Sequence, residues 1–290
     1  MAPFARVAIV GLGLIGGSIA LATARRWPDT AMVGIDRPDR LADLRGRGPL
    51  SQISADVAAA ADAELIILAA PVSQIAAILP ELGKHLPAPA LVTDTGSTKR
   101  AIVQAAASLP PHLRFIGGHP MAGDVRRGFD AARPDLFDDR PWLLTPDRPV
   151  SPELSRLMTF VDGLGGRPAL IDPARHDRIV AFVSHLPQLA ASALMEVVGS
   201  AVGAEGLACA GGGLQDTTRL AASAPGIWQE IFQSNEDLVG GALDDLIAAL
   251  GSLRRDLGSG AEVERLFTAA ADWRGRLLNG DRPSASSRDR

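Results

Sequence analysis

The chain has 290 residues, of which 47% are hydrophobic and 21% charged, and its formal net charge is −4. At this length a protein buries a large core and one domain begins to give way to two. The negative charge excludes an electrostatic surface for nucleic acid, and no uninterrupted apolar run reaches the ~20 residues of a membrane-spanning helix.

A single cysteine, Cys209, rules out an internal disulfide and fits a reducing compartment. A strand is predicted from Arg6 onward, which leaves no room for a signal peptide ahead of it. We therefore expect a cytoplasmic protein with a small-molecule substrate, no nucleic-acid or membrane partner and no bound metal.

Residues 6–118 alternate short apolar runs with helical patterns, which is typical of βαβ units and predicts a parallel sheet. A helix is predicted to follow the first strand as far as about Arg26. A further strand is predicted at 142–145 and an amphipathic helix at 153–164. The other predicted strands cover residues 7–10, 31–35, 65–69, 90–93 and 115–116.

Three glycines in G-x-G-x-x-G spacing, Gly11, Gly13 and Gly16, follow the first strand and open the helix. In a dinucleotide site the first permits a tight turn, the second lets the pyrophosphate approach the backbone and the third allows close helix packing. The free N–H groups of the helix start, around Leu14 and Ile15, favour phosphate. With an acid at the end of the next strand, the pattern predicts a dinucleotide site.

That acid is Asp36, whose carboxylate can accept hydrogen bonds from both adenosine ribose hydroxyls and would repel a 2′-phosphate. This favours NAD over NADP. Arg37 follows directly and can pair with a 2′-phosphate, so NADP use stays open. Pro71, which stops the strand at 65–69, is a further expected cofactor contact.

His119 lies in the run Gly117-Gly-His-Pro-Met-Ala-Gly123, just after the strand predicted at 115–116. We expect Gly117 and Gly118 to turn the chain sharply and Pro120 to fix φ after the histidine. The imidazole then stands at the carboxyl edge of the sheet, where open α/β sheets bind ligands. His119 is therefore a candidate proton acceptor beside a nicotinamide.

Another polar segment follows the strand predicted at 90–93 and reads Asp94-Thr-Gly-Ser-Thr-Lys99. Ser97 and Thr98 are good capping residues for the helix that follows. This reading leaves room for a further role of Ser97.

The pattern changes near Asp172, and no strand is predicted from residue 173 to about 278. The stretch 181–198 is apolar around most of its circumference, which indicates a helix buried in a bundle or between subunits. We predict an α/β, Rossmann-type domain over residues 1–172, an all-helical domain over 173–278 and a disordered tail over 279–290.

The helical half carries its own polar residues. His176 stands in a first helical turn, where local hydrogen bonds are an alternative to a ligand role. Arg219 offers a planar fork that binds a carboxylate in bidentate fashion, or it pairs weakly with Asp216 one turn earlier. Two further runs are Ser184-His-Leu-Pro-Gln188 and Ser223-Ala-Pro-Gly-Ile-Trp228.

Together the motifs at 94–99, 117–123, 184–188 and 216–228 resemble the prephenate dehydrogenase family, which includes arogenate and cyclohexadienyl dehydrogenases. The resemblance spreads from about residue 6 to about residue 240. It implies an NAD-dependent enzyme of tyrosine biosynthesis that decarboxylates prephenate oxidatively to 4-hydroxyphenylpyruvate, with arogenate as the alternative substrate. It also implies a homodimer with intertwined helical domains, and we expect neither a regulatory ACT domain nor a chorismate mutase segment.

The resemblance also implies roles for single residues. His119 accepts the substrate's hydroxyl proton through Nε2, Ser97 hydrogen-bonds this histidine and the substrate hydroxyl, and Arg219 holds a substrate carboxylate. The chain departs from the family at Gln188, where a second histidine is usual, and at Asp124-Val125, where Thr-Glu or Ser-Glu is usual. The remaining expected substrate contacts are His176, Ser184, Gln188 and Trp228.

Two other functions fit part of the sequence pattern. A β-hydroxyacid dehydrogenase has the same two-domain plan, but that family uses a lysine on the interdomain helix, and this chain has no lysine after Lys99. A non-catalytic NAD-binding regulator would have no need of Ser97, His119 and Arg219 together.

Overall fold

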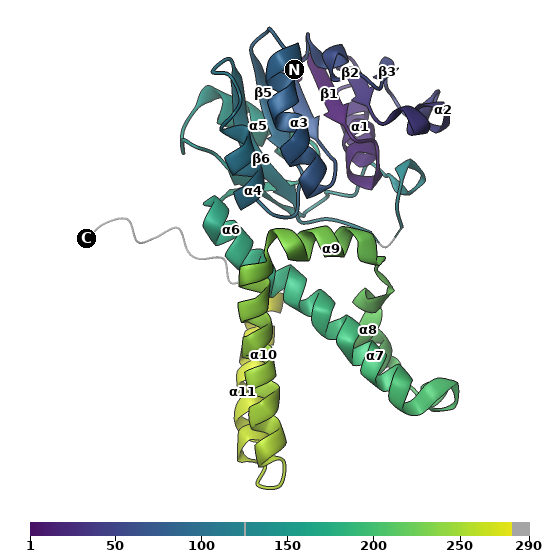
Figure 1. The fold of residues 1–290 in the computed structure, drawn as a ribbon, viewed down its shortest axis with the longest axis vertical. Coiled ribbons are helices and arrows are strands. Elements are labelled where there is room, and N and C mark those ends of the chain that lie inside the picture. Colours follow the sequence, from purple (N-terminus) through teal and green to yellow (C-terminus); the bar gives the residue numbers. More distant parts are fainter. Residues whose placement is uncertain (125, 280–290) are drawn as a thin grey trace, which may run out of the picture. The chain divides into compact units, whose positions relative to one another are not determined.

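The computed structural model describes residues 1–124 and 126–279 (Figure 1). Val125 and residues 280–290, which hold most of the tail predicted to be disordered, lie outside the described residues. Met1–Val239 forms one compact unit and the residues from Gly240 onward form another. The domain boundary expected after residue 172 falls inside the first unit and stays a prediction.

The first unit contains an eight-stranded sheet in the order β3-β2-β1-β4-β5-β6-β7-β8. All neighbours pair in parallel except β6 and β7, which are antiparallel, so the predicted parallel sheet is confirmed with one reversal. The strands are β1 (Arg6–Val10), β2 (Ala31–Ile35), β3 (Gln52–Ser54), β4 (Leu65–Leu68), β5 (Ala90–Asp94), β6 (Leu113–Pro120), β7 (Pro141–Thr145) and β8 (Arg167–Leu170).

The two strands that the sequence did not predict, β3 and β8, are the two edges of the sheet. Strand β3 has only three residues, and β8 contains Pro168, which a strand tolerates mainly at an edge. Neither gives the apolar run by which the inner strands were found.

Helices cover both faces of the sheet, and alternate residues of β1 point into the two cores that result. Val7 and Ile9 belong to one core with residues of α1 and α5, whereas Ala8 and Val10 belong to a second core with residues of α3 and α4. The helices of this part are α1 (Leu14–Arg26), the short α2 (Leu41–Leu44), α3 (Val72–His85), α4 (Arg100–Ala106) and α5 (Pro152–Gly163).

From residue 173 on, the described part of the chain contains helices and no strand, as predicted, so the fold class is confirmed. Helix α10 begins at the end of the first unit and, with α11, makes up the second. The helices are α6 (Pro173–Val180), α7 (Leu186–Leu207), α8 (Gly212–Thr218), α9 (Pro225–Ser234), α10 (Glu236–Asp256) and α11 (Ala261–Asn279).

A π-helical turn, Ala181–His185, joins α6 to α7. In a continuous α-helix Pro187 would leave the carbonyl of Val183 without a donor and its ring would crowd that group, and a wider turn relieves this conflict. His185, the last residue of the turn, is buried, whereas Phe182 and Val183 are exposed.

The stretch Pro173–Leu207 is, by length and composition, long and apolar enough to cross a membrane, although the sequence analysis expected no such segment. Its start is held within the protein, because the buried Asp177 accepts hydrogen bonds from the backbone at the beginning of α4. Further along, Leu194 and Val197 are exposed in the single chain. This apolar surface fits the predicted alternative of a helix between subunits.

Candidate active site

The glycine-rich turn is shaped by close backbone contacts. Gly11 has a φ of +94°, and a Cβ there would lie 2.4 Å from the carbonyl oxygen of Ala69. A Cβ on Gly16 would lie 1.9 Å from the carbonyl oxygen of Gly11, whereas a Cβ on Gly13 would meet nothing within 4 Å. Packing therefore requires the first and third glycines, and the second faces open space at the start of α1. A pyrophosphate fits that arrangement.

Asp36 is fixed at the end of β2 by two backbone groups. Its carboxylate accepts hydrogen bonds from the N–H of Leu12 and the N–H of Arg37, both at 2.8 Å. The Arg37 guanidinium lies 3.2 Å from the carboxylate of Asp39, and both side chains are exposed. The negative group at the strand end and the engaged arginine favour NAD over NADP.

The backbone around His119 differs from the prediction. Gly117 and Gly118 do not turn the chain: they lie in β6, which continues to Pro120 and pairs there with β7. A Cβ on Gly117 would lie 2.3 Å from the hydroxyl of Thr145, and one on Gly118 would lie 2.5 Å from the carbonyl oxygen of Asp94. These glycines are needed for close approach, and His119 is a strand residue.

A buried ion pair holds the backbone next to His119. The ladder between β5 and β6 ends at Ile116, and beyond it Asp94 accepts the N–H of Gly118 at 3.0 Å. Lys99 donates to the carbonyl of Gly118 at 2.8 Å and to the carboxylate of Asp94. Both charged side chains are fully buried. The pair thus replaces the missing strand ladder with side-chain hydrogen bonds.

His119 begins a chain of three side chains. Its Nδ1 lies 2.9 Å from Nε2 of His176, and Nδ1 of His176 lies 2.8 Å from the carboxylate of Asp177. His176 and Asp177 are completely buried, whereas His119 keeps 8% of its surface exposed. His119 is therefore the outward end of the chain, and its Nε2 makes no hydrogen bond among the described residues.

Asp177 also caps helix α4. It accepts hydrogen bonds from the backbone N–H of Lys99 at 2.6 Å and of Arg100 at 2.9 Å. The predicted caps are not used this way: Thr98 shares a hydrogen bond of 2.9 Å with the hydroxyl of Ser234. Among the hydrogen bonds of the described residues none joins Ser97 to His119, whose Nδ1 is paired with His176 instead. The role expected for Ser97 stays a prediction.

The electrostatics of this centre keep His119 and His185 neutral. Burial, with smaller contributions from His176 and Lys99, lowers the pKa of His119 well below 6.5. Burial lowers the pKa of His185 to about 4, although the Asp177 carboxylate opposes this. Hydrogen bonds from His176 and from the backbone of Arg100 hold the pKa of Asp177 low despite its burial. Asp177 is thus an ionised hydrogen-bond acceptor.

Two of the expected substrate contacts, His176 and Gln188, point into the protein in this structure. His176 has both ring nitrogens engaged within the protein and no exposed surface. Gln188 is also buried, and its amide holds Leu220 and Ser223 rather than facing outward. Each satisfies its own hydrogen bonds inside the protein, so neither is placed to touch a ligand directly.

Arg219, Trp228 and Ser184 keep the exposure that a ligand contact needs. Arg219 is exposed, and no ion pair among residues 1–124 and 126–279 engages it, so the weak pairing with Asp216 is not formed. Trp228 is half-buried and packs edge-on against His185 with ring centroids 6.2 Å apart. Ser184 is half-buried in the π-helical turn.

Comparison with known proteins decides the family. Residues 19–170 match the nucleotide-binding domain of prephenate dehydrogenase, and residues 172–269 match its dimerization domain. The chain belongs to the prephenate dehydrogenase family. It is similar to a prephenate dehydrogenase of Bacillus subtilis, with 32% identity over 93% of this chain and 76% of that protein.

Other family members give the same picture. A cyclohexadienyl dehydrogenase of Zymomonas mobilis is 32% identical over 89% of this chain and 90% of that protein. The crystal structure of prephenate dehydrogenase from A. aeolicus, in complex with hydroxyphenyl propionate and NAD⁺, superimposes with a TM-score of 0.83. That match has 28% identity and covers 97% of this chain and 99% of the other.

Three residues of the centre in this member of the prephenate dehydrogenase family were not predicted from the sequence: Asp94, Lys99 and Asp177. Asp94 and Lys99 are the first and last residues of the motif that contains Ser97. An acid and a base five residues apart in one polar segment could have suggested an ion pair. Asp177 adjoins His176, but its partners lie 77 and 78 residues earlier in the chain. No local pattern reveals contacts of that range.

Asp124 stands one position before the place where relatives in the family often carry glutamate. Hydrogen bonds from Arg126, both from its side chain and its backbone, hold the pKa of Asp124 at about 2. This carboxylate is therefore ionised and hydrogen-bonded to its neighbour. Val125, the other departure, lies outside the described residues.

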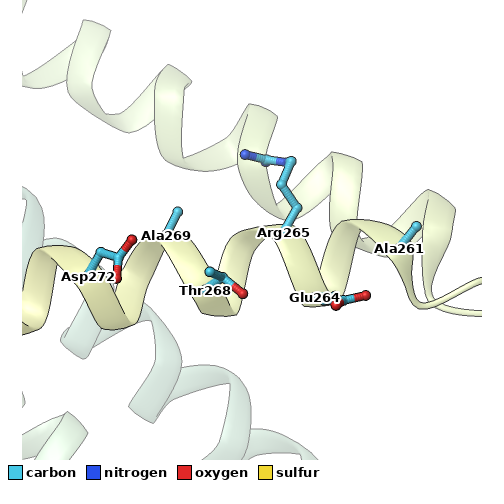
Figure 2. Close-up of a pocket in the computed structure, with 6 residues that line it drawn as sticks. All are labelled: Ala261, Glu264, Arg265, Thr268, Ala269 and Asp272. Atoms are coloured by element: carbon cyan, nitrogen blue, oxygen red, sulfur yellow. The ribbon is translucent and has the colours of Figure 1, made fainter.

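The second unit has a shallow pocket of its own on α11 (Figure 2). Its polar lining is Glu264, Arg265, Thr268 and Asp272, and Arg265 is engaged by Glu262. None of the residues expected from the family motifs lines it. We assign it no role in the chemistry of this prephenate dehydrogenase relative.

Because His185 is buried in its neutral form, we expect the folded protein to become less stable in acid. Its pKa is 6.5 when unfolded and about 4 when folded, so the unfolded chain binds more protons between these values. The free energy of unfolding should therefore fall as pH drops from 6.5 to 4, by up to about 3 kcal/mol from this group. Urea unfolding at a series of pH values measures it.

His185→Gln should flatten this dependence, whereas the same change at the half-buried His112, whose ring bonds to the carbonyl of Leu86, is the matched control. An equal pH slope in wild type and His185→Gln would contradict the assignment.

Proposed function

We propose that this chain catalyses the NAD-dependent oxidative decarboxylation of prephenate to 4-hydroxyphenylpyruvate, a step of tyrosine biosynthesis. The observation that carries the proposal is the hydrogen-bonded chain from His119 through His176 to Asp177. It orients one nearly buried imidazole and leaves the outer nitrogen of that ring free to accept a proton.

The proton positions along this chain follow from its inner end. An ionised carboxylate only accepts hydrogen bonds, so Nδ1 of His176 carries the proton that Asp177 receives. With Nε2 of His176 as the acceptor of the next hydrogen bond, Nδ1 of His119 donates to it. The remaining nitrogen of His119, Nε2, has a free lone pair. This is the atom that a general base needs.

Besides this base, the reaction needs groups that position the substrate. Nε2 of His119 takes the proton of the 4-hydroxyl as the hydride leaves the same ring carbon, and loss of carbon dioxide then makes the ring aromatic. Ser97 is proposed to orient the hydroxyl. We assign a substrate carboxylate to the exposed guanidinium of Arg219, and the wall of the pocket to Trp228 and Ser184.

The residues proposed to hold NAD are those of the first βαβ unit. The nicotinamide, when bound, supplies the acceptor for the hydride. Gly13 and the start of α1 would receive the pyrophosphate, and Asp36 the adenosine ribose. The other proposed contacts are Gly11, Leu14, Ile15, Gly16, Arg37 and Pro71.

Two further features belong to the proposal. The dimerization domain and the exposed apolar residues of α7 support a homodimer, with the second copy covering Leu194 and Val197. The single cysteine and the biosynthetic role support a cytoplasmic enzyme.

The alternative substrate is arogenate, which carries an amine in place of the side-chain keto group and would yield tyrosine directly. It is favoured by one observation: a cyclohexadienyl dehydrogenase is as similar in identity as a prephenate dehydrogenase. No charged group at position 188 distinguishes the two side chains, because Gln188 is neutral and turned inward.

The test is NADH formation, followed by absorbance, with NAD and either prephenate or arogenate. We expect turnover of prephenate, and the ratio of kcat/KM for the two substrates decides which is preferred. NAD binding without turnover of either substrate would instead support a non-catalytic NAD-binding regulator.

A further inference from the structure

We propose that Gln188 is a positioning residue for Arg219: its side-chain amide holds the short turn that presents the guanidinium and so sets the affinity for the substrate carboxylate. This inference rests on the proposed function, in which Arg219 receives that carboxylate.

The contacts of Gln188 lead to one place. Its Nε2 donates to the carbonyl of Leu220 at 2.8 Å, and its Oε1 accepts a hydrogen bond from the hydroxyl of Ser223 at 3.2 Å. Its Nε2 also lies 3.3 Å from the hydroxyl of Ser192 on the same helix. Gln188 is buried and Leu220 and Ser223 are half-buried, so these hydrogen bonds are partly shielded from water.

The turn that it holds is short and carries the arginine. Arg219–Ala222 is a 3₁₀ turn, and Leu220 lies directly after the arginine. Inside the turn the N–H of Ser223 bonds to the carbonyl of Leu220 at 3.0 Å. The amide of Gln188 therefore binds the same carbonyl and the residue that closes the turn, from the side of α7.

Arg219 itself is held by little else. It is exposed, and no salt bridge in the described part of the chain fixes its guanidinium. A flexible cation gives up more conformational freedom when it binds a ligand than one whose backbone is already fixed. Holding the turn thus prepares Arg219 for its ligand.

The choice of glutamine suits this task. Its amide donates and accepts at the same time and cannot be protonated in the accessible pH range. An imidazolium in this place could only donate, and would lose the bond from the hydroxyl of Ser223. We therefore expect the hold on the turn to be independent of pH.

The test compares Gln188→Leu with wild type in steady-state kinetics. We expect the KM for prephenate to rise about tenfold through loss of the hydrogen bonds that hold the turn. We expect kcat and the KM for NAD to stay within about twofold, since the variant leaves His119 and the glycine-rich turn untouched. Gln104→Leu, an exposed glutamine on α4, is the matched control.

A double-mutant cycle separates positioning from a general structural effect. In an Arg219→Ala background, Gln188→Leu should raise the KM for prephenate by less than about twofold, because the group it positions is gone. Independent, multiplying effects would overturn the proposal. So would a Gln188→Leu variant whose kcat and KM for NAD change as much as its KM for prephenate.

Ser223→Ala keeps the proposal testable if Gln188→Leu does not fold. It removes one of the two contacts, and we expect the KM for prephenate to rise about threefold. An unchanged KM would overturn the proposal. Absence of wild-type turnover would instead defeat the proposed function, and an unchanged KM in Arg219→Ala would defeat the carboxylate assignment on which the inference rests.

Discussion

Replacing His119 by asparagine is expected to lower kcat by about 10²–10⁴-fold, the usual contribution of a positioned general base. Asparagine retains polarity in a nearly buried place, but its amide cannot take up the proton that Nε2 receives. The affinity for NAD should stay unchanged, because the glycine-rich turn and Asp36 are unaffected. NADH formation at saturating prephenate and a calorimetric titration with NAD measure the two effects separately.

The matched control for this change is His85→Asn, at an exposed histidine at the end of α3, which should retain wild-type kcat. If His119→Asn kept kcat within about tenfold of wild type, another group would have to be the base.

The pH dependence of wild-type kcat/KM gives an independent check. The neutral ring is the active form, and burial lowers the pKa of His119 well below 6.5. As pH falls through 6.5, His119 therefore stays neutral and kcat/KM should hold; the loss should begin only at lower pH. An acid limb centred at 6.5 or above would contradict the buried, histidine-paired environment.

Sequence reasoning located His119 and the sheet edge correctly but misread the backbone. Two adjacent glycines suggest a turn because local preference is all that a single sequence offers. The structure uses them to let Asp94 and Thr145 approach a continuing strand. Only the three-dimensional packing distinguishes a glycine needed for its φ from a glycine needed for its missing Cβ.

The glycine-rich turn, in contrast, was predicted correctly, because its residues are close together in the sequence. Gly11, Gly16 and their strand and helix are neighbours in the chain, so spacing alone encodes their geometry. Asp177 bonds to Lys99, 78 residues away, and Gln188 bonds to Leu220, 32 residues away. Judged from the sequence alone, the side chains of Asp177 and Gln188 could equally have faced a ligand. The family resemblance assigned His176 and Gln188 to the substrate, and the structure turns both toward other protein groups.

Replacing Lys99 by methionine is expected to lower the free energy of unfolding by about 3–5 kcal/mol, the cost of leaving one charge of a buried pair without its partner. Methionine fills most of the space of the lysine stem, so the loss is mainly electrostatic. Asp94 would remain fully buried with hydrogen bonds only from the backbone of Gly96 and Gly118. Urea unfolding followed by circular dichroism measures the difference.

Lys84→Met is the natural control, because Lys84 is exposed and pairs only with the exposed Glu81, so its loss should change stability by less than about 0.5 kcal/mol. The double variant Asp94→Asn, Lys99→Met should recover part of the loss, since the uncompensated charge is gone while the N–H of Gly118 keeps an acceptor. Lys99 also holds the carbonyl of Gly118, next to His119, so Lys99→Met should lower kcat as well as stability. The double variant should regain stability but not kcat. Equal stability of Lys99→Met and Lys84→Met would show that the pair does not support the strand that carries the base.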